Sequence, residues 1–314
     1  MKTQKIGKSR LVSTRLAYGC MRVAGTWEPK EVTPEKIAAG KKAIVAAYEA
    51  GYTLFDHADI YCRGECEAIH GLALKDVRGM KERIVIATKC GIRFARDPKP
   101  TSPHRYDFSA EHVLRSCEGS LKRLGVERID LYQLHRPDVL MNPEEVAVVF
   151  EKLKKQGKVR ELGVSNFLPS QLTALQSACS LPLVVNQVEI HLGRLNCFSD
   201  GTLDQCLTEK ITPLSWSPLG GGFLGTGGVV KEDHPRRKVM LGVQKLLDEL
   251  ARAYGVSRTV MALAWLLKHP SGIIPIVGST KPEHIKDAVK ADEVDVDRED
   301  WYRLLEATRG EPLP

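Results

Sequence analysis

Short apolar runs alternate with longer stretches of helical period along almost the whole chain. The apolar runs are residues 15–19, 53–58, 84–91, 130–135, 161–166, 184–190, 211–218 and 272–279, and helical stretches between them include 34–51, 109–125, 143–157 and 169–179. Strands that are apolar on both faces and alternate with helices are typical of a parallel sheet. Eight such units predict an α/β fold of the closed (β/α)8 kind, a TIM barrel, rather than an open doubly wound sheet.

The ends of the helical stretches carry the residues that helix termini favour. Ser109 is a predicted N-cap before the apolar positions Val113 and Leu114. Two helical stretches, 241–255 and 258–270, follow the seventh apolar run, so one helix is extra to the barrel pattern. The stretch 297–310 predicts a last helix packed against the barrel. With an N-terminal hairpin and no segment of linker composition, we expect residues 1–314 to form one domain.

The composition narrows the class of protein. The 314 residues are 43% hydrophobic and 27% charged, which is typical of a globular protein with an ample core. No apolar run approaches the roughly 18 residues of a membrane span, and the N-terminus is too polar for a signal peptide, so we expect a cytoplasmic protein. The eight cysteines lack CxxC spacing and are expected to be free thiols. A net charge of +7 without a long basic block gives nucleic-acid binding little support.

Four polar residues follow three of the apolar runs. Asp56 and Tyr61 end the run LFDHADIY, Lys89 ends IVIATK, and His135 ends DLYQLH. The carboxyl ends of the strands of a barrel meet at one face, and the chemistry of such barrels lies there. The sequence therefore predicts that a carboxylate, a phenol, an ammonium and an imidazole meet in one site.

This quartet suits proton transfer to or from a carbonyl oxygen. The pKa of a free tyrosine, about 10, is high for transfer near neutrality, and a nearby ammonium lowers it by stabilising the phenolate. A buried lysine needs a carboxylate partner. We therefore expect Tyr61 as the proton donor, Lys89 as the cation, Asp56 as its partner and neutral His135 as the group that orients the carbonyl.

At these motifs the chain resembles the aldo-keto reductase superfamily, and the likeness runs over almost its whole length. The family pattern DTAxxY reads DHADIY here, with His57 where threonine is usual, and the lysine and histidine motifs read ATKCG and LYQLHRPD. The resemblance implies that Asp56, Tyr61, Lys89 and His135 are the catalytic tetrad. Among subgroups, GCMRVAGTW and DHADIYCRGECE are most similar to bacterial oxidoreductases of the YdhF type.

The resemblance also implies a nicotinamide cofactor, NADP(H) and possibly NAD(H), and a small-molecule carbonyl or alcohol substrate. Ser165, Asn166 and Gln187 match the residues that hold the nicotinamide carboxamide, and Trp216 replaces the tyrosine whose ring stacks on the nicotinamide. The full set assigned to the cofactor is Met21, Arg22, Asp56, Ser165, Asn166, Gln187, Trp216, Ser217, Pro218, Leu219, Gly220, Gly221, Gly222, Phe223, Gly278, Ser279, Thr280, Lys281 and His284.

Two loops are candidates for the phosphates, because the seventh and eighth loops of such barrels hold them. The seventh, LGGGFLGTGG, matches GxGxxG literally, but no helix opens on it as a dinucleotide fold requires. We expect a flexible loop that closes over the pyrophosphate. In the eighth, GSTKPEH, Lys281 is expected to bind the adenosine 2′-phosphate. His284 stands where many family members have an arginine, and Ala288 where some have an asparagine, which predicts a softer preference for NADP.

Three other interpretations compete with a reductase. Asp56, His57, Asp59, His135 and His191 could form the metal site of a barrel hydrolase, but Tyr61 and Lys89 would then be idle. A non-catalytic nicotinamide sensor on the same barrel is also consistent with the motifs. Short-chain dehydrogenases are excluded, because no tyrosine has a lysine four residues later. The substrate itself is not readable, although some residues are candidates for its contacts: Arg22 and Arg93 for a carboxylate, and Trp27, Phe94, Tyr106 and Phe198 for aromatic walls.

Overall fold

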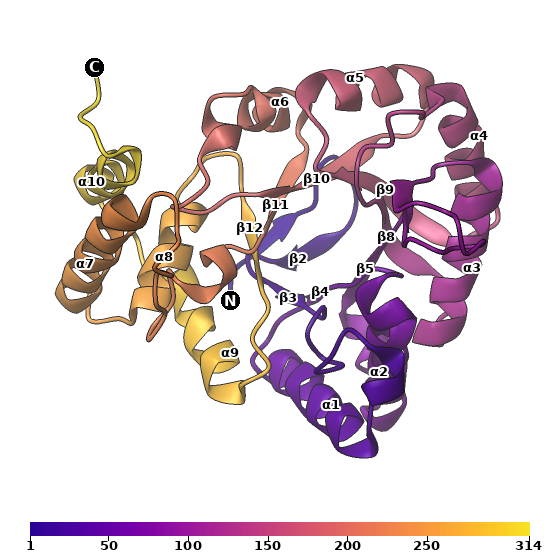
Figure 1. Ribbon diagram of the computed structural model, residues 1–314, viewed down its shortest axis with the longest axis horizontal. Coiled ribbons are helices and arrows are strands. Elements are labelled where there is room, and N and C mark those ends of the chain that lie inside the picture. The colour runs from indigo at the N-terminus through magenta and orange to yellow at the C-terminus, as the bar shows by residue number, and fades with distance from the viewer.

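A closed barrel of eight parallel strands forms the centre of the protein (Figure 1). The computed structural model describes residues 1–314. Around the barrel the strands are β3 (Ala17–Gly19), β4 (Leu54–Asp56), β5 (Val85–Cys90), β8 (Ile129–Leu134), β9 (Val159–Ser165), β10 (Leu183–Glu189), β11 (Thr212–Trp216) and β12 (Ile274–Val277). Each overlaps one of the predicted apolar runs, and β12 closes the barrel against β3. The predicted (β/α)8 fold is confirmed.

The barrel interior changes from apolar to polar along the strands. Every second side chain of a strand faces the same side, so Leu54 and Asp56 share the interior face of β4. An inner cluster of twelve buried apolar residues, Leu54, Ala87 and Leu131 among them, fills the barrel below this level. Further along the strands, Lys89 lies beside Gln133 in the sheet. Polar side chains therefore gather at the carboxyl ends.

Helices surround the barrel. They are α1 (Pro34–Glu49), α2 (Glu65–Asp76), α3 (Ala110–Leu124), α4 (Pro143–Lys155), α5 (Pro169–Ala178), α6 (Thr202–Glu209), α7 (Arg237–Ala253), α8 (Arg258–Leu267), α9 (Pro282–Ala288) and α10 (Arg298–Arg309). Ser109 caps α3 by accepting from the backbone N–H of His112, as predicted. Both α7 and α8 lie between β11 and β12, which confirms the extra helix.

The last helix does not pack against the barrel, and that prediction was wrong. α10 lies outside, along α7 at the periphery (Figure 1). Trp301 of α10 stacks on Trp265 of α8, with ring centroids 5.0 Å apart, and each indole N–H donates to the other residue's carbonyl. α10 thus packs on the outer side of α7 and α8 rather than on the barrel wall.

An N-terminal hairpin closes the end of the barrel that lies opposite the polar carboxyl ends of the strands. Strands β1 (Thr3–Lys5) and β2 (Val12–Thr14) pair antiparallel. Ile6 and Leu11, in the turn between them, are buried in the inner cluster together with Val184 at the start of β10. The hairpin therefore seals the amino ends of the strands and leaves the carboxyl ends as the mouth. A second short pair, β6 (Ile92–Arg93) and β7 (Arg105–Tyr106), follows β5.

Two further observations bear on the class of protein. None of the helices combines the length and the apolar character that a membrane crossing requires. All eight cysteines are buried free thiols, as the sequence predicted.

Candidate functional site

Four side chains meet at the mouth of the barrel, as the sequence predicted. The Nζ of Lys89 donates to both carboxylate oxygens of Asp56, at 2.8 and 2.9 Å, and to the hydroxyl of Tyr61 at 3.3 Å. It also donates to the carbonyl of His57 at 2.5 Å. The ring of His135 lies edge-on to the ring of Tyr61, with centroids 5.9 Å apart. All four members of the quartet are buried.

Burial and nearby charges shift the pKa values of Tyr61 and His135 in opposite directions. Burial raises the pKa of the Tyr61 phenol, the Lys89 ammonium lowers it, and the balance is a pKa of about 12. The expected lowering by lysine is present, but the loss of water around the phenol outweighs it. Burial, and then the charges of Lys89 and Arg136, hold the pKa of His135 well below its ordinary value. Near neutrality the site therefore contains a protonated phenol and a neutral imidazole.

Asn166 connects the backbone of His135 to the indole of Trp216. Its amide nitrogen donates to the His135 carbonyl at 3.1 Å and to the Ser165 hydroxyl at 2.8 Å. Its amide oxygen accepts from the indole N–H of Trp216 at 2.9 Å. A tyrosine at position 216 would place its hydroxyl beyond the ring and could not make this indole bond. The tryptophan that departs from the family pattern thus anchors Asn166.

One buried acceptor near this network has no partner. The side-chain oxygen Oε1 of Gln187 is buried and unbonded, whereas the Ser165 hydroxyl donates to the Gln187 carbonyl at 2.8 Å. A buried acceptor without a partner is costly unless a ligand or water completes it. The carboxamide N–H groups of a nicotinamide are suitable donors, and the half-exposed indole of Trp216 lies one strand away on β11. The residues present fit the cofactor that the motifs imply.

Several strand ends at the mouth adopt backbone conformations that ordinary residues avoid. Asn166, which follows β9, has φ of 62°, and Ser217, which follows β11, has φ of 49°. Cys62 and Arg63, directly after Tyr61, have φ of 47° and 50°. Left-handed conformations of residues other than glycine persist where the surroundings impose them, often at functional sites. The loops after β4, β9 and β11 carry this strain, and each of them contributes residues to the predicted site.

The loop after β11 has an open glycine segment. Pro218 and Leu219 lead into Gly220, Gly221 and Gly222, which all have positive φ, and Gly221 and Gly222 face open space. Phe223 ends this segment, and its ring meets the ring of His191 edge-on, with centroids 6.1 Å apart. The backbone of these three glycines can approach a phosphate closely because no Cβ stands in the way.

The loop after β12 lies beside the loop after β3, because these two strands are neighbours. Tyr18 donates from its hydroxyl to the Ser279 carbonyl at 3.1 Å and so fixes the first loop. The backbone N–H of Lys281 donates to the Ser279 hydroxyl at 3.2 Å, and α9 begins one residue later. The predicted cofactor residues at this part of the rim are all exposed or half-exposed: Met21, Arg22, Gly278, Ser279, Thr280, Lys281 and His284.

Asp56 and His191 of the alternative metal site have other partners. Nδ1 of His57, Oδ1 of Asp59 and Nδ1 of His135 are buried without a partner. Asp56 is bound by Lys89, and His191 accepts from the backbone N–H of Gly193 and contacts Glu189. His57 faces His70 of α2, with 2.5 Å between Nε2 and Nδ1. With Cys20 these two histidines form a buried group of possible metal ligands. The spacing of the two nitrogens is that of a hydrogen bond, and two atoms that both bind one ion lie further apart.

Two of the candidate substrate contacts are not supported. Arg93, expected to suit a carboxylate, is already paired with Asp97 at 3.1 Å and Asp107 at 2.8 Å. Phe198, expected as an aromatic wall, packs against Trp265 and Trp301 in the outer helices. In contrast, Trp27 meets the ring of Tyr61 edge-on at 6.3 Å.

Sequence reasoning missed two polar residues near the tetrad. Gln133 is fully buried in the barrel beside Lys89, and neither atom of its amide has a partner. Arg136 follows His135, and its guanidinium lies 5.5 Å from the centre of the Trp216 ring. A glutamine inside the buried run DLYQLH and an arginine directly after it were the available signals.

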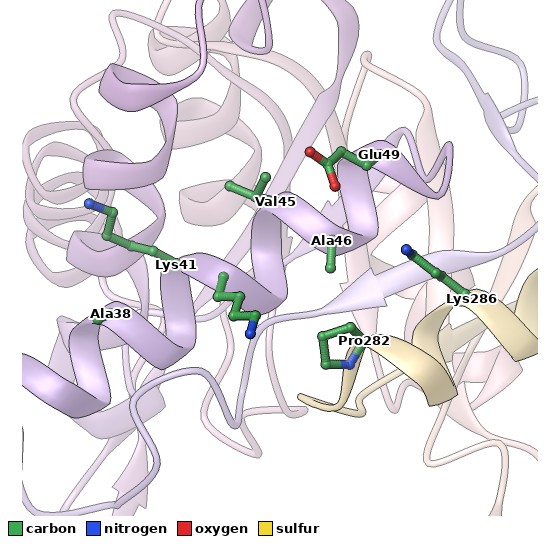
Figure 2. A pocket seen from close by; sticks show the side chains of 8 residues that line it. Ala38, Lys41, Val45, Ala46, Glu49, Pro282 and Lys286 are labelled. Carbon is green, nitrogen blue, oxygen red and sulfur yellow. The ribbon is translucent and has the colours of Figure 1, made fainter.

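One surface groove lies away from the tetrad. A groove of about 450 Å³ lies between α1 and α9 on the outside of the barrel (Figure 2). Its lining includes Lys41 and Lys42 of α1 and Lys286 of α9, and none of the tetrad. The chemistry-bearing residues and the strained loops are at the mouth, so we locate the candidate site there.

Comparisons with known proteins agree with this architecture. Residues 15–309 match the Aldo/keto reductase family, and the chain belongs to that family. It is 39% identical over 317 residues to a 6-dehydroglucose reductase of Novosphingobium aromaticivorans, covering 99% of this chain and 97% of that protein. It is 39% identical to the oxidoreductase YdhF of Escherichia coli over 272 residues, covering 85% and 86%. A solved glycerol dehydrogenase from Gluconobacter oxydans superposes with a TM-score of 0.85 at 25% identity, covering 99% and 97%.

Proposed function

We propose that this oxidoreductase reduces aldehydes and ketones to alcohols with NADPH, and that Tyr61 donates the proton. The observation that carries the proposal is the position of the Lys89 ammonium, which contacts the carboxylate of Asp56 and the hydroxyl of Tyr61 at once. A phenol held against a buried cation can release its proton to a carbonyl oxygen while the cation stabilises the phenolate that remains.

The tetrad residues divide the work. Tyr61 stays protonated near neutrality because its pKa is raised to about 12, so it acts as a donor rather than a base. Asp56 keeps Lys89 charged in a buried position, and the pKa of Lys89 is raised although burial alone would lower it. Neutral His135 can donate a second hydrogen bond to the carbonyl oxygen without adding charge. The bound nicotinamide supplies the hydride.

The cofactor is held by loops from several strands. Asn166 and Gln187 offer amide groups to the carboxamide, and Trp216 offers its ring for stacking. The segment Gly220–Gly222 can approach the pyrophosphate, and the exposed Lys281 supplies a positive charge for the 2′-phosphate. Because His284 replaces the more frequent arginine, NADH remains a weaker alternative cofactor.

The similar proteins suggest where to begin with substrates. One relative is called a 6-dehydroglucose reductase and a structural neighbour a glycerol dehydrogenase. Sugar-derived aldehydes and polyols are therefore the first compounds to test. Eight free thiols suit a protein kept in a reducing compartment such as the cytoplasm.

Calorimetric titration of the protein with NADPH, and separately with NADH, tests the cofactor assignment. We expect NADPH to bind more tightly, and we expect Lys281→Ala to weaken NADPH much more than NADH. The exposed Lys290, which pairs with Asp287, supplies the matched control Lys290→Ala. No binding of either nucleotide would rule out the proposed function. An unchanged affinity ratio in Lys281→Ala would remove Lys281 from the phosphate site.

A further inference from the structure

Arg136 reaches across the mouth of the barrel. It follows β8, whereas the ring of Trp216 belongs to β11, and β9 and β10 lie between these strands in the barrel. Its guanidinium lies 5.5 Å from the centre of that ring, and the indole N–H of the same ring reaches Asn166 at the end of β9, so Arg136 and Trp216 together span the carboxyl ends of β9 and β10. The guanidinium therefore lies at the mouth of the barrel, on the residue directly after His135.

The charge of Arg136 is not neutralised by an ion pair, unlike the charges of Arg93 and Arg194. Arg93 is bound by two carboxylates, and Arg194 contacts Glu189 at 3.7 Å. The carboxylate of Glu189 on the rim is engaged by His191 at 3.4 Å as well as by Arg194. Arg136 is half-buried and has only the face of an indole as a partner.

A half-buried guanidinium has five N–H donors that require acceptors. The indole face attracts its charge but accepts few of these hydrogen bonds. A carboxylate matches the planar fork of a guanidinium and binds it through two parallel bonds. No hydrogen-bond acceptor of the protein engages the guanidinium of Arg136, so its donors are available to a substrate at the mouth of the barrel.

We propose that Arg136 binds a carboxylate of the substrate, so that the preferred substrates are carbonyl compounds that carry an acid group. This inference rests on the proposed reductase function for its substrate role, but the binding of a carboxylate does not require turnover. Arg136 thereby takes the role that the sequence had assigned to Arg93.

Rates with matched substrates test the proposal. The kcat/KM of the purified protein is measured for para-carboxybenzaldehyde and for its methyl ester, which has nearly the same shape but no charge. We expect a preference of about ten- to a hundred-fold for the acid, the range of a charged hydrogen bond, and its loss in Arg136→Met. Arg136→Lys keeps the charge and should retain part of the preference.

Arg63→Met is the matched control, because the Arg63 guanidinium also lies against an aromatic ring of the rim, 4.6 Å from the centre of Phe94. It should leave the preference unchanged, and circular dichroism checks that each variant is folded. Equal rates for acid and ester in the unaltered protein would overturn the proposal. A loss of NADPH affinity in Arg136→Met without a change of preference would also overturn it, by assigning Arg136 to the cofactor.

Calorimetric titration of the cofactor-free protein with benzoate separates this inference from the reductase function. We expect benzoate to bind the unaltered protein and Arg136→Lys, and to bind Arg136→Met at least tenfold more weakly. If neither aldehyde were reduced and NADPH did not bind, the reductase function would fail while the benzoate result still decided the role of Arg136. No difference in benzoate binding among the variants would refute the proposal.

Discussion

His57 and His70 form a hydrogen-bonded pair of imidazoles behind the tetrad. Their Nε2 and Nδ1 atoms are 2.5 Å apart, and both side chains are fully buried. The pKa values of both rings are lowered by burial, that of His70 to about 3, so both rings are neutral. The carbonyl of His57 accepts from Lys89. The pair therefore fixes the backbone that holds Lys89.

This pair predicts a pH-dependent stability. A depressed pKa in the folded protein gives stability that is present above the unfolded value of 6.5 and is lost as the pH falls toward 3. His70→Phe removes that loss but leaves Nε2 of His57 without a partner, which costs about 1–3 kcal/mol. We expect the variant to be less stable at pH 7 and the gap to narrow in acid.

Urea denaturation across this pH range measures the effect. His104, which is exposed, provides the control His104→Phe, whose stability should run parallel to that of the unaltered protein. A gap that stayed constant or widened in acid would show that the neutral pair is not the cause.

Asp59 predicts the opposite pH dependence. Burial, and then the charge of Glu67, raise the pKa of Asp59 to about 7. A raised pKa gives stability that is full below the ordinary value and is lost as the pH rises through 7. We therefore expect Asp59→Asn to gain stability relative to the unaltered protein between pH 5 and pH 8. Thermal unfolding at both pH values measures this, and an equal difference at both would contradict the assignment.

We predict that removing Lys89 alone from its buried ion pair with Asp56 destabilises the protein more than removing both charges. Lys89→Met leaves the Asp56 carboxylate buried without its partner, which costs about 3–5 kcal/mol of the free energy of unfolding. The double variant with Asp56→Asn removes that charge as well, so it should recover part of the loss. If the double variant were less stable than Lys89→Met alone, the account of the pair would be wrong.

We predict that Trp216 contributes to cofactor binding through its bond to Asn166 as well as through stacking of its ring. Trp216→Tyr keeps an aromatic ring but removes the indole N–H that bonds Asn166. Loss of one such bond is worth about 1 kcal/mol, so NADPH affinity should fall roughly fivefold. Calorimetry is suitable because the readout does not depend on the altered indole. An unchanged affinity would mean that Asn166 needs no anchor.

Much of the fold could be read from the sequence, because each strand and helix is encoded locally. Eight apolar runs gave the barrel strands, and the cap at Ser109 gave the start of α3. The tail was misplaced for a physical reason. Its apolar face fits any apolar surface, and nothing local shows that Trp301 stacks on Trp265 rather than on the barrel.

The meeting of the four residues of the tetrad could be predicted because they stand at the carboxyl ends of three neighbouring strands, β4, β5 and β8, whereas their surroundings could not be predicted. The pairing of His57 with His70 joins a loop to the buried face of α2, and no spacing rule reveals it. The contact of Arg136 with Trp216 depends on the directions of both side chains at the ends of β8 and β11. The pKa of Tyr61 is a balance of burial against the charge of Lys89, and sequence alone gives only the sign of the second effect.

The most direct test of the account compares Tyr61→Phe with the unaltered protein. NADPH binding is measured by calorimetry, and reduction of a simple aldehyde by the loss of NADPH absorbance. We predict that the variant binds NADPH with nearly unchanged affinity and reduces the aldehyde at least a hundredfold more slowly, because the proton donor is gone. A variant that bound NADPH and reduced the aldehyde at the original rate would contradict the central claim.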